Sequence, residues 1–379
     1  MSITIILFLV EFVRGAYLIA FLPTYSVDEL GLPISIAGTA ITAHYLTDTV
    51  FKIWIGYLLD RFSARTIVFA GLLLSAIGLF ATQYAHLAWI LILSSALFGI
   101  GASPIWIVCL SQVRQNERAT RMGMLYTLWL IGLGAGPVAI NFLIDYSYSL
   151  SLFVLIGLWL IAWLISFRLS DERISTGDTP SFGQQLKRLW DRLKKLKPLL
   201  PGMVLQTAAA GMLVPVMPTF TTKVLGFSHA TYSYTMIAGG VFAVAGLIPM
   251  GKLSDRFNKK WFLVLGFGLL AFSLYALLFV SQLNQALFLA AVMGLSYSAV
   301  LPAWNALLSY HVPDDQQGVG WGIFSSVEGI GVMFGPVIGG WIADWLYESA
   351  TIAISAVLLL GISIFYLLYP FQRLLPPKP

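Results

Sequence analysis

The chain has 379 residues, of which 58% are hydrophobic and only 10% are charged, with a net charge of +5. Soluble proteins carry about 25% charged residues, so this composition excludes a water-soluble enzyme, and it equally excludes a disordered chain. One cysteine and four scattered histidines exclude a disulfide framework and a cysteine-based metal site. The sequence therefore predicts an all-α polytopic membrane protein.

Twelve apolar segments are long enough to cross the hydrocarbon core, which takes about 20 helical residues. They cover residues 3–24, 34–58, 66–84, 87–111, 121–144, 149–168, 199–221, 231–253, 261–281, 285–309, 320–343 and 349–370. The first segment contains Glu11 and Arg14 and has no small-residue cleavage site, so we interpret it as a span and not as a signal peptide.

A polar stretch at residues 169–198 separates six spans from six. It predicts an N-terminal six-helix bundle at 1–168, a linker at 169–198 and a C-terminal six-helix bundle at 199–379. Within the linker, residues 182–196 have the spacing of an amphipathic interfacial helix, although a plain charged tether explains them equally well. Nearly all lysines and arginines lie in the loops on the linker's side, which predicts that both termini are cytoplasmic.

The two halves share motifs at a nearly constant offset. Gly-x-x-x-Asp-Arg-Phe begins at Gly56 and again at Gly251, 195 residues later, and the glycine pattern ending in Gly136-Pro137 recurs as Gly335-Pro336. We expect the first motif to form a latch between the halves at the cytoplasmic ends of spans 2 and 8, beyond its role as a topology signal. The latch residues are Gly56, Asp60, Arg61, Arg65, Asp255 and Arg256. The glycines allow close helix approach, with plain packing as the alternative.

Ionisable residues inside a span cost at least ~2.5–3.5 kcal/mol each and are candidates for function. Glu11 and Arg14 are three residues apart and can form an ion pair. Asp48 shares one stripe of span 2 with His44 and Lys52. We interpret Asp48 as a proton carrier with Arg14 as its partner, Glu11 as a second carboxylate and His44 as a further coupling residue. A static ion-pair network is the alternative, and Lys52 is expected to extend toward the cytoplasmic surface.

Spans 7–12 carry a single interior acid, Glu328. Trp106, Trp129 and Trp304 lie deep in their spans, where indole rings can stack on sugars, and Asn305 can hydrogen-bond beside them. Packing is the alternative for each tryptophan. Because the intramembrane charge lies almost entirely in one half, we expect an amphiphilic cargo.

With these motifs the chain resembles the major facilitator superfamily, which implies the major facilitator fold with 12 transmembrane helices as two six-helix bundles. Glu11-Phe-x-Arg14-Gly15, His44-x3-Asp48, Ser103-Pro104-Ile-Trp106 and Leu301-Pro302-Ala-Trp304-Asn305 further resemble the proton-coupled flippases of the lipoteichoic-acid anchor glycolipid. The resemblance implies that Glu11, Arg14 and Asp48 serve headgroup binding and proton coupling and that Trp106 and Trp129 contact sugars. Lys52 and Glu328 depart from the neutral polar residues that it leads us to expect.

We therefore expect a multi-pass transporter of the bacterial plasma membrane that flips diglucosyl diacylglycerol from the inner to the outer leaflet, with Trp304, Asn305 and Glu328 as further substrate contacts. The proton gradient would drive it without a cofactor. Expected partners are the glycolipid, protons and membrane lipids but not nucleic acid, for a monomer that contacts glycolipid- or lipoteichoic-acid-synthesis enzymes. The alternative is a proton-driven multidrug efflux antiporter. A lipid-modifying enzyme has no motif in its favour, so we do not expect an enzyme.

Overall fold

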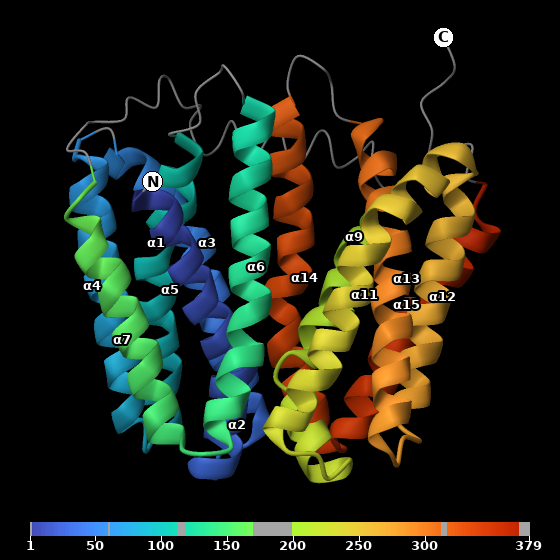
Figure 1. The fold of residues 1–379 in the computed structure, drawn as a ribbon, viewed down its shortest axis with the longest axis horizontal. Helices are drawn as coiled ribbons and strands as arrows, with labels where there is room; N and C mark the ends of the chain where they lie inside the picture. The colour runs from blue at the N-terminus through green and yellow to red at the C-terminus, as the bar shows by residue number, and fades with distance from the viewer. Residues whose placement is uncertain (1, 60, 112–117, 170–198, 312–316, 371–379) are drawn as a thin grey trace. The chain divides into compact units, whose positions relative to one another are not determined.

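The computed structural model describes residues 2–59, 61–111, 118–169, 199–311 and 317–370, and every element that these residues form is helical (Figure 1). Each predicted span coincides with a described helix. Ten described helices are long and apolar enough to cross a membrane, or eleven when the bent pair Gly202–Leu213 and Met217–Val224 counts as one span. Helix α3 (Ile34–Leu59) occupies the remaining predicted span. Its 26 residues extend about 39 Å at 1.5 Å per residue, but its polar side chains lower its mean hydropathy.

The chain divides into two compact units, and the first comprises Met1–Thr179 together with Ser228–Ser233. Its helices are α1 (Ser2–Gly15), η1 (Ala16–Phe21), α2 (Leu22–Thr24), η2 (Tyr25–Glu29), α3, α4 (Ala64–Ala81), η3 (Thr82–Tyr84), α5 (Ala88–Ser111), α6 (Arg118–Ile144) and α7 (Tyr148–Ser166). Helix α1 packs against α6 and α7, while α5 packs against α3 and α4. Ser63 begins α4 as its N-cap, since its hydroxyl accepts a hydrogen bond from the Thr66 N–H at 3.3 Å.

The second unit comprises Pro180–Phe227 and Tyr234–Pro379. Its helices are α9 (Leu200–Leu213), α10 (Met217–Thr219), η5 (Phe220–Val224), most of α11 (His229–Arg256), α12 (Lys259–Leu277), α13 (Leu283–Ser309), α14 (Gln317–Trp345) and α15 (Glu348–Leu368). Helix α9 packs against α14 and α15, as α1 does against α6 and α7 in the first unit. Residues 170–198 of the predicted linker at 169–198, which include the predicted amphipathic helix at 182–196, lie outside the described residues.

The sequence repeat is also a structural repeat. In each unit the first span ends in Pro-Thr followed by a π-helical turn, η2 or η5. A glycine with positive φ closes each turn, Gly31 at 65° and Gly226 at 70°, again 195 residues apart. Residues other than glycine adopt this conformation rarely, so the two turns are built on the same local requirement.

The repeated glycines of α6 and α14 lie at helix–helix contacts. A Cβ atom on Gly136 would meet the Phe12 carbonyl of α1, and one on Gly335 would meet the Ala208 carbonyl of α9. These two glycines therefore allow the close approach of the first and fifth spans in each unit.

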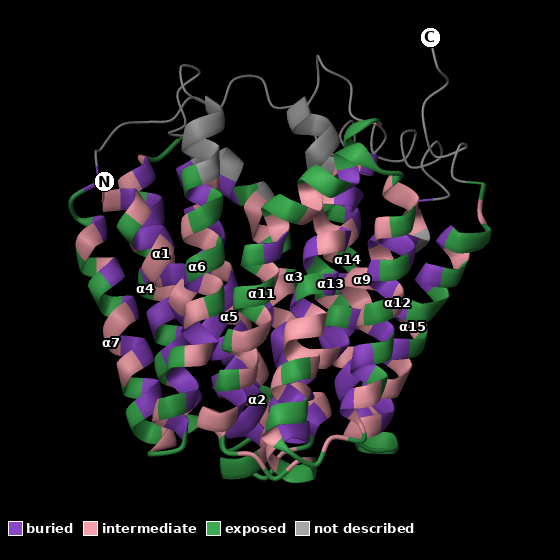
Figure 2. Cartoon of the chain, turned by 45° about the vertical axis from the view of Figure 1, so that its right-hand side comes forward, coloured by how far each residue is buried: buried purple, intermediate pink, exposed green. Residues whose placement is uncertain are grey.

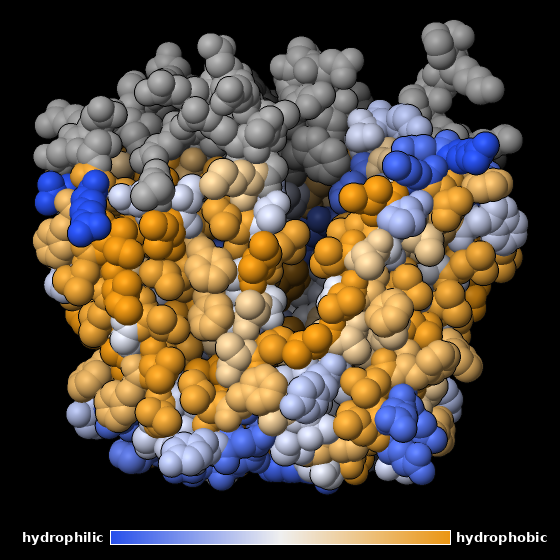
Figure 3. Space-filling model, in the orientation of Figure 1, coloured by the Kyte–Doolittle hydropathy of each residue, from blue (hydrophilic) through white to orange (hydrophobic). Residues whose placement is uncertain are grey.

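The outward-facing residues of the helices are largely apolar. Figure 2 shows exposed residues distributed along the helices, and Figure 3 shows hydrophobic side chains over their middle and hydrophilic ones near their ends. Ile248 is 71% exposed and Phe272 is 67% exposed. Large apolar side chains left exposed along whole helices indicate a lipid-facing surface.

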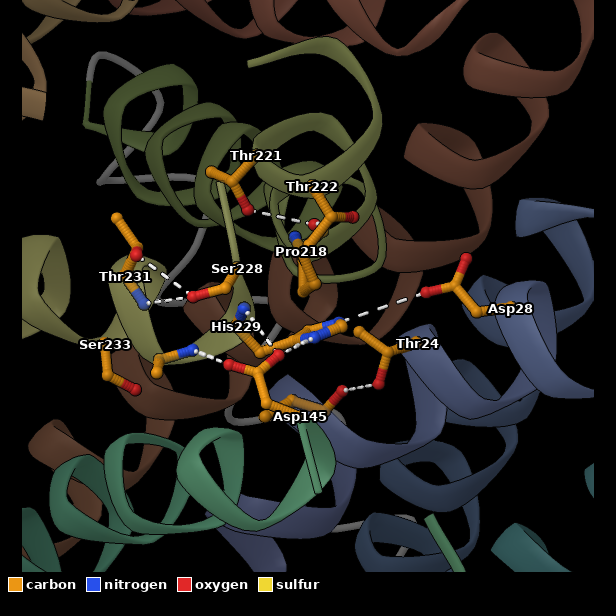
Figure 4. A network of polar contacts seen from close by, with 12 residues as sticks. Thr24, Asp28, Asp145, Pro218, Thr221, Thr222, Ser228, His229, Thr231 and Ser233 are labelled. Atoms are coloured by element: carbon orange, nitrogen blue, oxygen red, sulfur yellow. Dashed lines mark hydrogen bonds and ion pairs between the residues drawn. The ribbon is translucent and has the colours of Figure 1, made fainter. Parts of the chain in front are cut away.

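Asp145 holds the first turn of α11, whose residues Ser228–Ser233 belong to the first unit (Figure 4). Its carboxylate accepts the His229 N–H at 3.0 Å and the Ala230 N–H at 2.7 Å, and it also contacts His229 Nδ1 at 2.8 Å. The Ser228 hydroxyl accepts the Thr231 N–H at 3.1 Å. Three backbone donors that a helix start leaves unpaired are thus satisfied. No motif in the sequence predicts this contact.

Candidate functional site

Helix α1 places Glu11 and Arg14 on one face. The three-residue spacing brings them one turn apart, and Arg14 Nε lies 3.4 Å from Glu11 Oε2. Both side chains are largely buried, with 4% of Glu11 and 13% of Arg14 exposed. Two buried charges of opposite sign compensate each other, which lowers the cost of holding either within a membrane span.

Helix α3 brings Asp48 to the same place. Arg14 Nη1 lies 4.0 Å from Asp48 Oδ2, so the predicted meeting of Arg14 and Asp48 is present in the structure. A shorter ion pair joins the same oxygen to Lys52 Nζ, 2.7 Å away on the next turn of α3. Lys52 was expected to extend toward the cytoplasmic surface. It binds Asp48 instead, because the i,i+4 spacing places its ammonium group directly beside the carboxylate.

The four side chains form a row of alternating charge, Glu11, Arg14, Asp48 and Lys52, which we call the charge row. Two carboxylates face two cations, so the row is neutral overall when every group is ionised. Asp48 Oδ1 is buried and has no hydrogen-bond partner among the described residues. The row therefore retains a buried acceptor that a hydroxyl group or a proton can occupy.

His44 is separate from these ion pairs. It is fully buried, and its ring lies 5.0 Å from that of Phe98 and 5.4 Å from that of Tyr45. Neither ring nitrogen has a well-formed hydrogen bond in the described part of the chain. The structure thus places His44 one turn before Asp48, as predicted, but in an aromatic environment.

The two predicted tryptophans of the first unit lie together beside the charge row. The ring centroid of Trp106 lies 6.5 Å from that of Trp129 and 5.2 Å from that of Tyr126. The side chain of Trp129 is also a hydrogen-bond partner of Glu11. An aromatic surface next to buried carboxylates suits a sugar, whose C–H faces stack on rings and whose hydroxyls donate hydrogen bonds.

The second unit contains a cavity of about 350 Å³. Glu328, Trp304 and Asn305, all predicted from sequence, line it. Trp304 Nε1 donates a 2.8 Å hydrogen bond to Glu328 Oε1, and Gln206 Nε2 donates to the same oxygen at 3.4 Å. Trp304 is only 2% exposed. The rest of the wall is largely apolar; its lining includes Leu213, Phe267, Leu270, Leu274, Met293 and Leu359.

Sequence reasoning missed Gln206 and Tyr297, which also line this cavity. The repeat could have found the first. Its offset of 195 residues carries Glu11 onto Gln206, and the offset of 199 residues that relates α6 to α14 carries Trp129 onto Glu328. In each unit a polar residue of the first span therefore meets a residue of the fifth span at corresponding positions.

The predicted latch is described only in part. Asp60 lies outside the described residues, and the surroundings of Gly56 are not described either. Arg61 is exposed in the turn between α3 and α4, and Arg256 is exposed at the end of α11. Asp255 is 76% exposed, with Lys259 Nζ 3.8 Å away. Arg65 lines a hollow with Thr66, Phe69 and Phe167. The role of these residues as a latch stays a prediction.

The part of the chain that the structure describes holds no group of three or more histidine, cysteine, aspartate or glutamate side chains placed to bind a metal ion. The chemistry available to the described site is that of buried ion pairs, hydrogen bonds and aromatic faces.

Comparison with known proteins gives a consistent result. The sequence matches the family model of the Major Facilitator Superfamily over residues 3–205 and 199–379. It is 34% identical over 370 residues to the proton-coupled antiporter flippase LtaA of Staphylococcus saprophyticus, covering 96% of this chain and 92% of that protein. The protein of the same name from Staphylococcus aureus strain N315 is 32% identical over the same shares.

Solved structures share the fold at low sequence identity. The nucleoside transporter NupG superposes with a TM-score of 0.79 at 16% identity, over 97% of both chains. A bacterial homolog of the human lysosomal transporter Spinster, in an inward-facing and occupied conformation, gives a TM-score of 0.75 at 14% identity, over 97% of this chain and 95% of that chain. At these identities the likeness concerns the fold alone.

Proposed function

Because the chain belongs to the major facilitator superfamily, we propose that it is a proton-coupled antiporter that flips a glycolipid between membrane leaflets. Its relatives named proton-coupled antiporter flippase match it over 96% of its length, which supports the reaction type. The cargo that we propose is diglucosyl diacylglycerol, the anchor glycolipid of lipoteichoic acid, moved from the inner to the outer leaflet. The movement is alternating access, in which a midplane site opens to one side and then the other.

The observation that carries this proposal is the charge row beside two indole rings. Sugar hydroxyls donate hydrogen bonds to the carboxylates of Glu11 and Asp48, and the Asp48 Oδ1 atom has no other partner among the described residues. Trp106 and Trp129 supply the stacking surface. A disaccharide headgroup thus has both acceptors and aromatic faces in the first unit.

Asp48 is the proton carrier in this proposal. Its carboxylate can exchange an ion pair for a proton, which changes the charge of the row by one and alters its hold on the headgroup. Arg14 remains paired with Glu11 when this happens. His44 is buried one turn away on the same helix, so its electrostatic environment changes with the charge of Asp48. The proton gradient drives the cycle, and the transport involves no cofactor and no chemical step.

The acyl chains and the remaining contacts belong to the second unit in this proposal. Leu270, Leu274 and Leu359 provide apolar wall, while Trp304, Asn305 and Glu328 provide polar groups in the same cavity. We place the protein in the bacterial plasma membrane with both termini in the cytoplasm, acting as a monomer alongside the enzymes that make the glycolipid or lipoteichoic acid.

A flipping assay tests this function. The purified protein is reconstituted into liposomes with fluorescent diglucosyl diacylglycerol, and a membrane-impermeant quencher reports the leaflet of the label under an imposed pH gradient. We expect gradient-dependent flipping in the wild type and at least a tenfold loss in Asp48→Asn, with headgroup binding retained. Glu29→Gln neutralises an exposed carboxylate of the same unit and serves as the matched control. No flipping above protein-free liposomes would refute the cargo, and unchanged gradient dependence in Asp48→Asn would refute the carrier.

A second candidate, proton-driven efflux of lipophilic cations, has one observation in its favour. Glu328 lies in a largely apolar cavity next to an indole ring, and no lysine or arginine of the described residues forms an ion pair with it. A carboxylate beside an aromatic ring is suited to an organic cation. Gradient-driven transport of a fluorescent lipophilic cation, together with no glycolipid flipping, would favour this candidate.

A further inference from the structure

The shortest ion pair of the charge row lies within one helix. Lys52 Nζ is 2.7 Å from Asp48 Oδ2, whereas Arg14 Nη1 is 4.0 Å from the same oxygen. Two cations therefore face one carboxylate oxygen, and Lys52 holds the closer position. Because a hydrogen bond between ionised groups is strong at 2.7–2.9 Å and weak at 4 Å, Lys52 is the main partner of Asp48 in this conformation.

The two cations differ in what they can do when Asp48 becomes neutral. The Lys52 side chain is 34% exposed, but that of Arg14 is only 13% exposed. Arg14 also has a second carboxylate, Glu11, at 3.4 Å. A released Lys52 ammonium group can be hydrated, since it can reach solvent while its long methylene stem stays buried. A released Arg14 would stay paired with Glu11.

Protonation of Asp48 consequently divides the row into a neutral Glu11–Arg14 pair and one hydrated cation. No buried charge is left without compensation, which is the costly outcome when one member of a buried ion pair is neutralised. Without Lys52 the row would carry one uncompensated negative charge while Asp48 is ionised, because Arg14 alone would face two carboxylates.

We propose that Lys52 is a positioning residue that holds the Asp48 carboxylate in place through its ion pair, and that it moves into solvent when Asp48 takes up the transported proton. This inference rests on the proposed function, in which Asp48 carries the proton. Lys52 acts through Asp48 and does not contact the cargo.

Other groups near Asp48 have a fixed place in this arrangement. Helix α1 contributes Glu11 and Arg14, and α3 itself contributes His44, Tyr45 and Lys52. Helix α5, which packs against α3, has Cys109 as its one titratable side chain. The other neighbours of α3 are η2 and α4, whose titratable side chains lie near the ends of α3. These side chains are Tyr25, Asp28 and Glu29 of η2 and Arg65 of α4. Lys52 is thus the exposed cation among the groups that share a row with Asp48.

Infrared titration of the reconstituted protein tests the inference without any cargo. The carboxylic-acid C=O band that Asp48→Asn removes reports protonation of Asp48. In Lys52→Gln this band should appear at a higher pH than in the wild type, because the substitution removes the cation that lies 2.7 Å from the carboxylate. Lys52→Arg keeps a cation and should titrate close to the wild type. Lys252→Gln removes an exposed lysine of α11 and is the control.

Each result has a defined consequence. A band that titrates identically in the wild type and Lys52→Gln overturns the role of Lys52 and leaves the proposed function intact. An equal shift in Lys252→Gln overturns it as well, because the effect would then be one of net charge. If no band depends on Asp48, the proposed carrier and this inference fall together. If the wild type does not flip the glycolipid but the band shifts as expected in Lys52→Gln, only the proposed cargo is refuted.

Transport supplies a second readout. The pH at which gradient-driven flipping is half-maximal should move upward in Lys52→Gln by the same amount as the infrared band, and Lys52→Arg should restore it. In the Asp48→Asn background, Lys52→Gln should cause no further change in headgroup binding. An additional loss of binding there would mean that Lys52 contacts the headgroup directly and would overturn its assignment as a positioning residue.

Discussion

Replacing Asp145 by alanine should destabilise the start of α11. The substitution removes two charge-assisted bonds to backbone N–H groups, at 3.0 and 2.7 Å, and one contact to His229 Nδ1 at 2.8 Å. Loss of a helix cap costs about 0.5–2 kcal/mol. Loss of a negative charge at a helix N-terminus costs about 0.3–1 kcal/mol, and we take the lower end because 28% of the side chain is exposed. The expected total is about 1–2 kcal/mol.

The effect should depend on pH in a defined direction. Burial opposes ionisation of Asp145, but the hydrogen bonds from Ala230 and His229 outweigh it and lower the pKa of the carboxyl below its ordinary value. A group whose folded-state pKa is lowered stabilises the fold above its unfolded-state pKa, near 4, and this stabilisation is lost as the pH falls through the lowered value. The difference between wild type and Asp145→Ala should therefore be full at pH 7 and shrink below pH 4.

Thermal unfolding in detergent measures this difference. With about 2–4 °C per kcal/mol for a unit of this size, the apparent melting temperature should fall by several degrees at pH 7. Asp145→Asn keeps one acceptor and should fall between wild type and alanine, while Glu29→Ala, an exposed carboxylate of the same unit, should have little effect. Equal melting temperatures for wild type and Asp145→Ala at pH 7 would show that the contact does not hold the helix start.

Two further substitutions test the packing and the second cavity. Gly136→Ala should cost about 1–3 kcal/mol of stability, because its Cβ atom would collide with the α1 backbone. Gly134→Ala is the control, since no atom lies within 4 Å of the added Cβ on the same helix, and it should be tolerated. Equal effects of the two substitutions would contradict the contact. Trp304→Phe should lower stability by about 1.5–3 kcal/mol, because Glu328 loses its 2.8 Å hydrogen bond. Glu328→Gln keeps an acceptor for the indole N–H and should cost less. The reverse order in the same melting assay would contradict this assignment.

Local sequence patterns predicted the helices well, but they predicted only some of the contacts between side chains. Long apolar runs predicted every span, and the spacing of Glu11 and Arg14 predicted their ion pair, because helical periodicity alone decides both. The partner of Asp48 was harder. Periodicity places Lys52 on the same stripe but does not decide whether a flexible lysine extends to the surface or binds the carboxylate, which depends on its rotamer and depth.

Contacts between distant segments were beyond such patterns. Asp145 and His229 are 84 residues apart, and nothing in the surrounding sequence of either one indicates the other. Gln206 was missed for a different reason. It carries no charge, and intramembrane charge is the signal that singles out functional residues in the sequence, although the repeat offset connects Gln206 with Glu11.

The correspondence of Glu11 with Gln206 and of Trp129 with Glu328 means that the chain contains its own comparison. One copy of the framework has its acid on the first span, facing an indole on the fifth; the other has its acid on the fifth span, facing an amide on the first. The backbone turns and glycine contacts are common to both copies. The two repeats thus share their architecture, but the acid lies on the first span in one and on the fifth span in the other. Exchanging these residues between the two repeats would test whether the binding properties of each unit are determined by these side chains or by the rest of the unit.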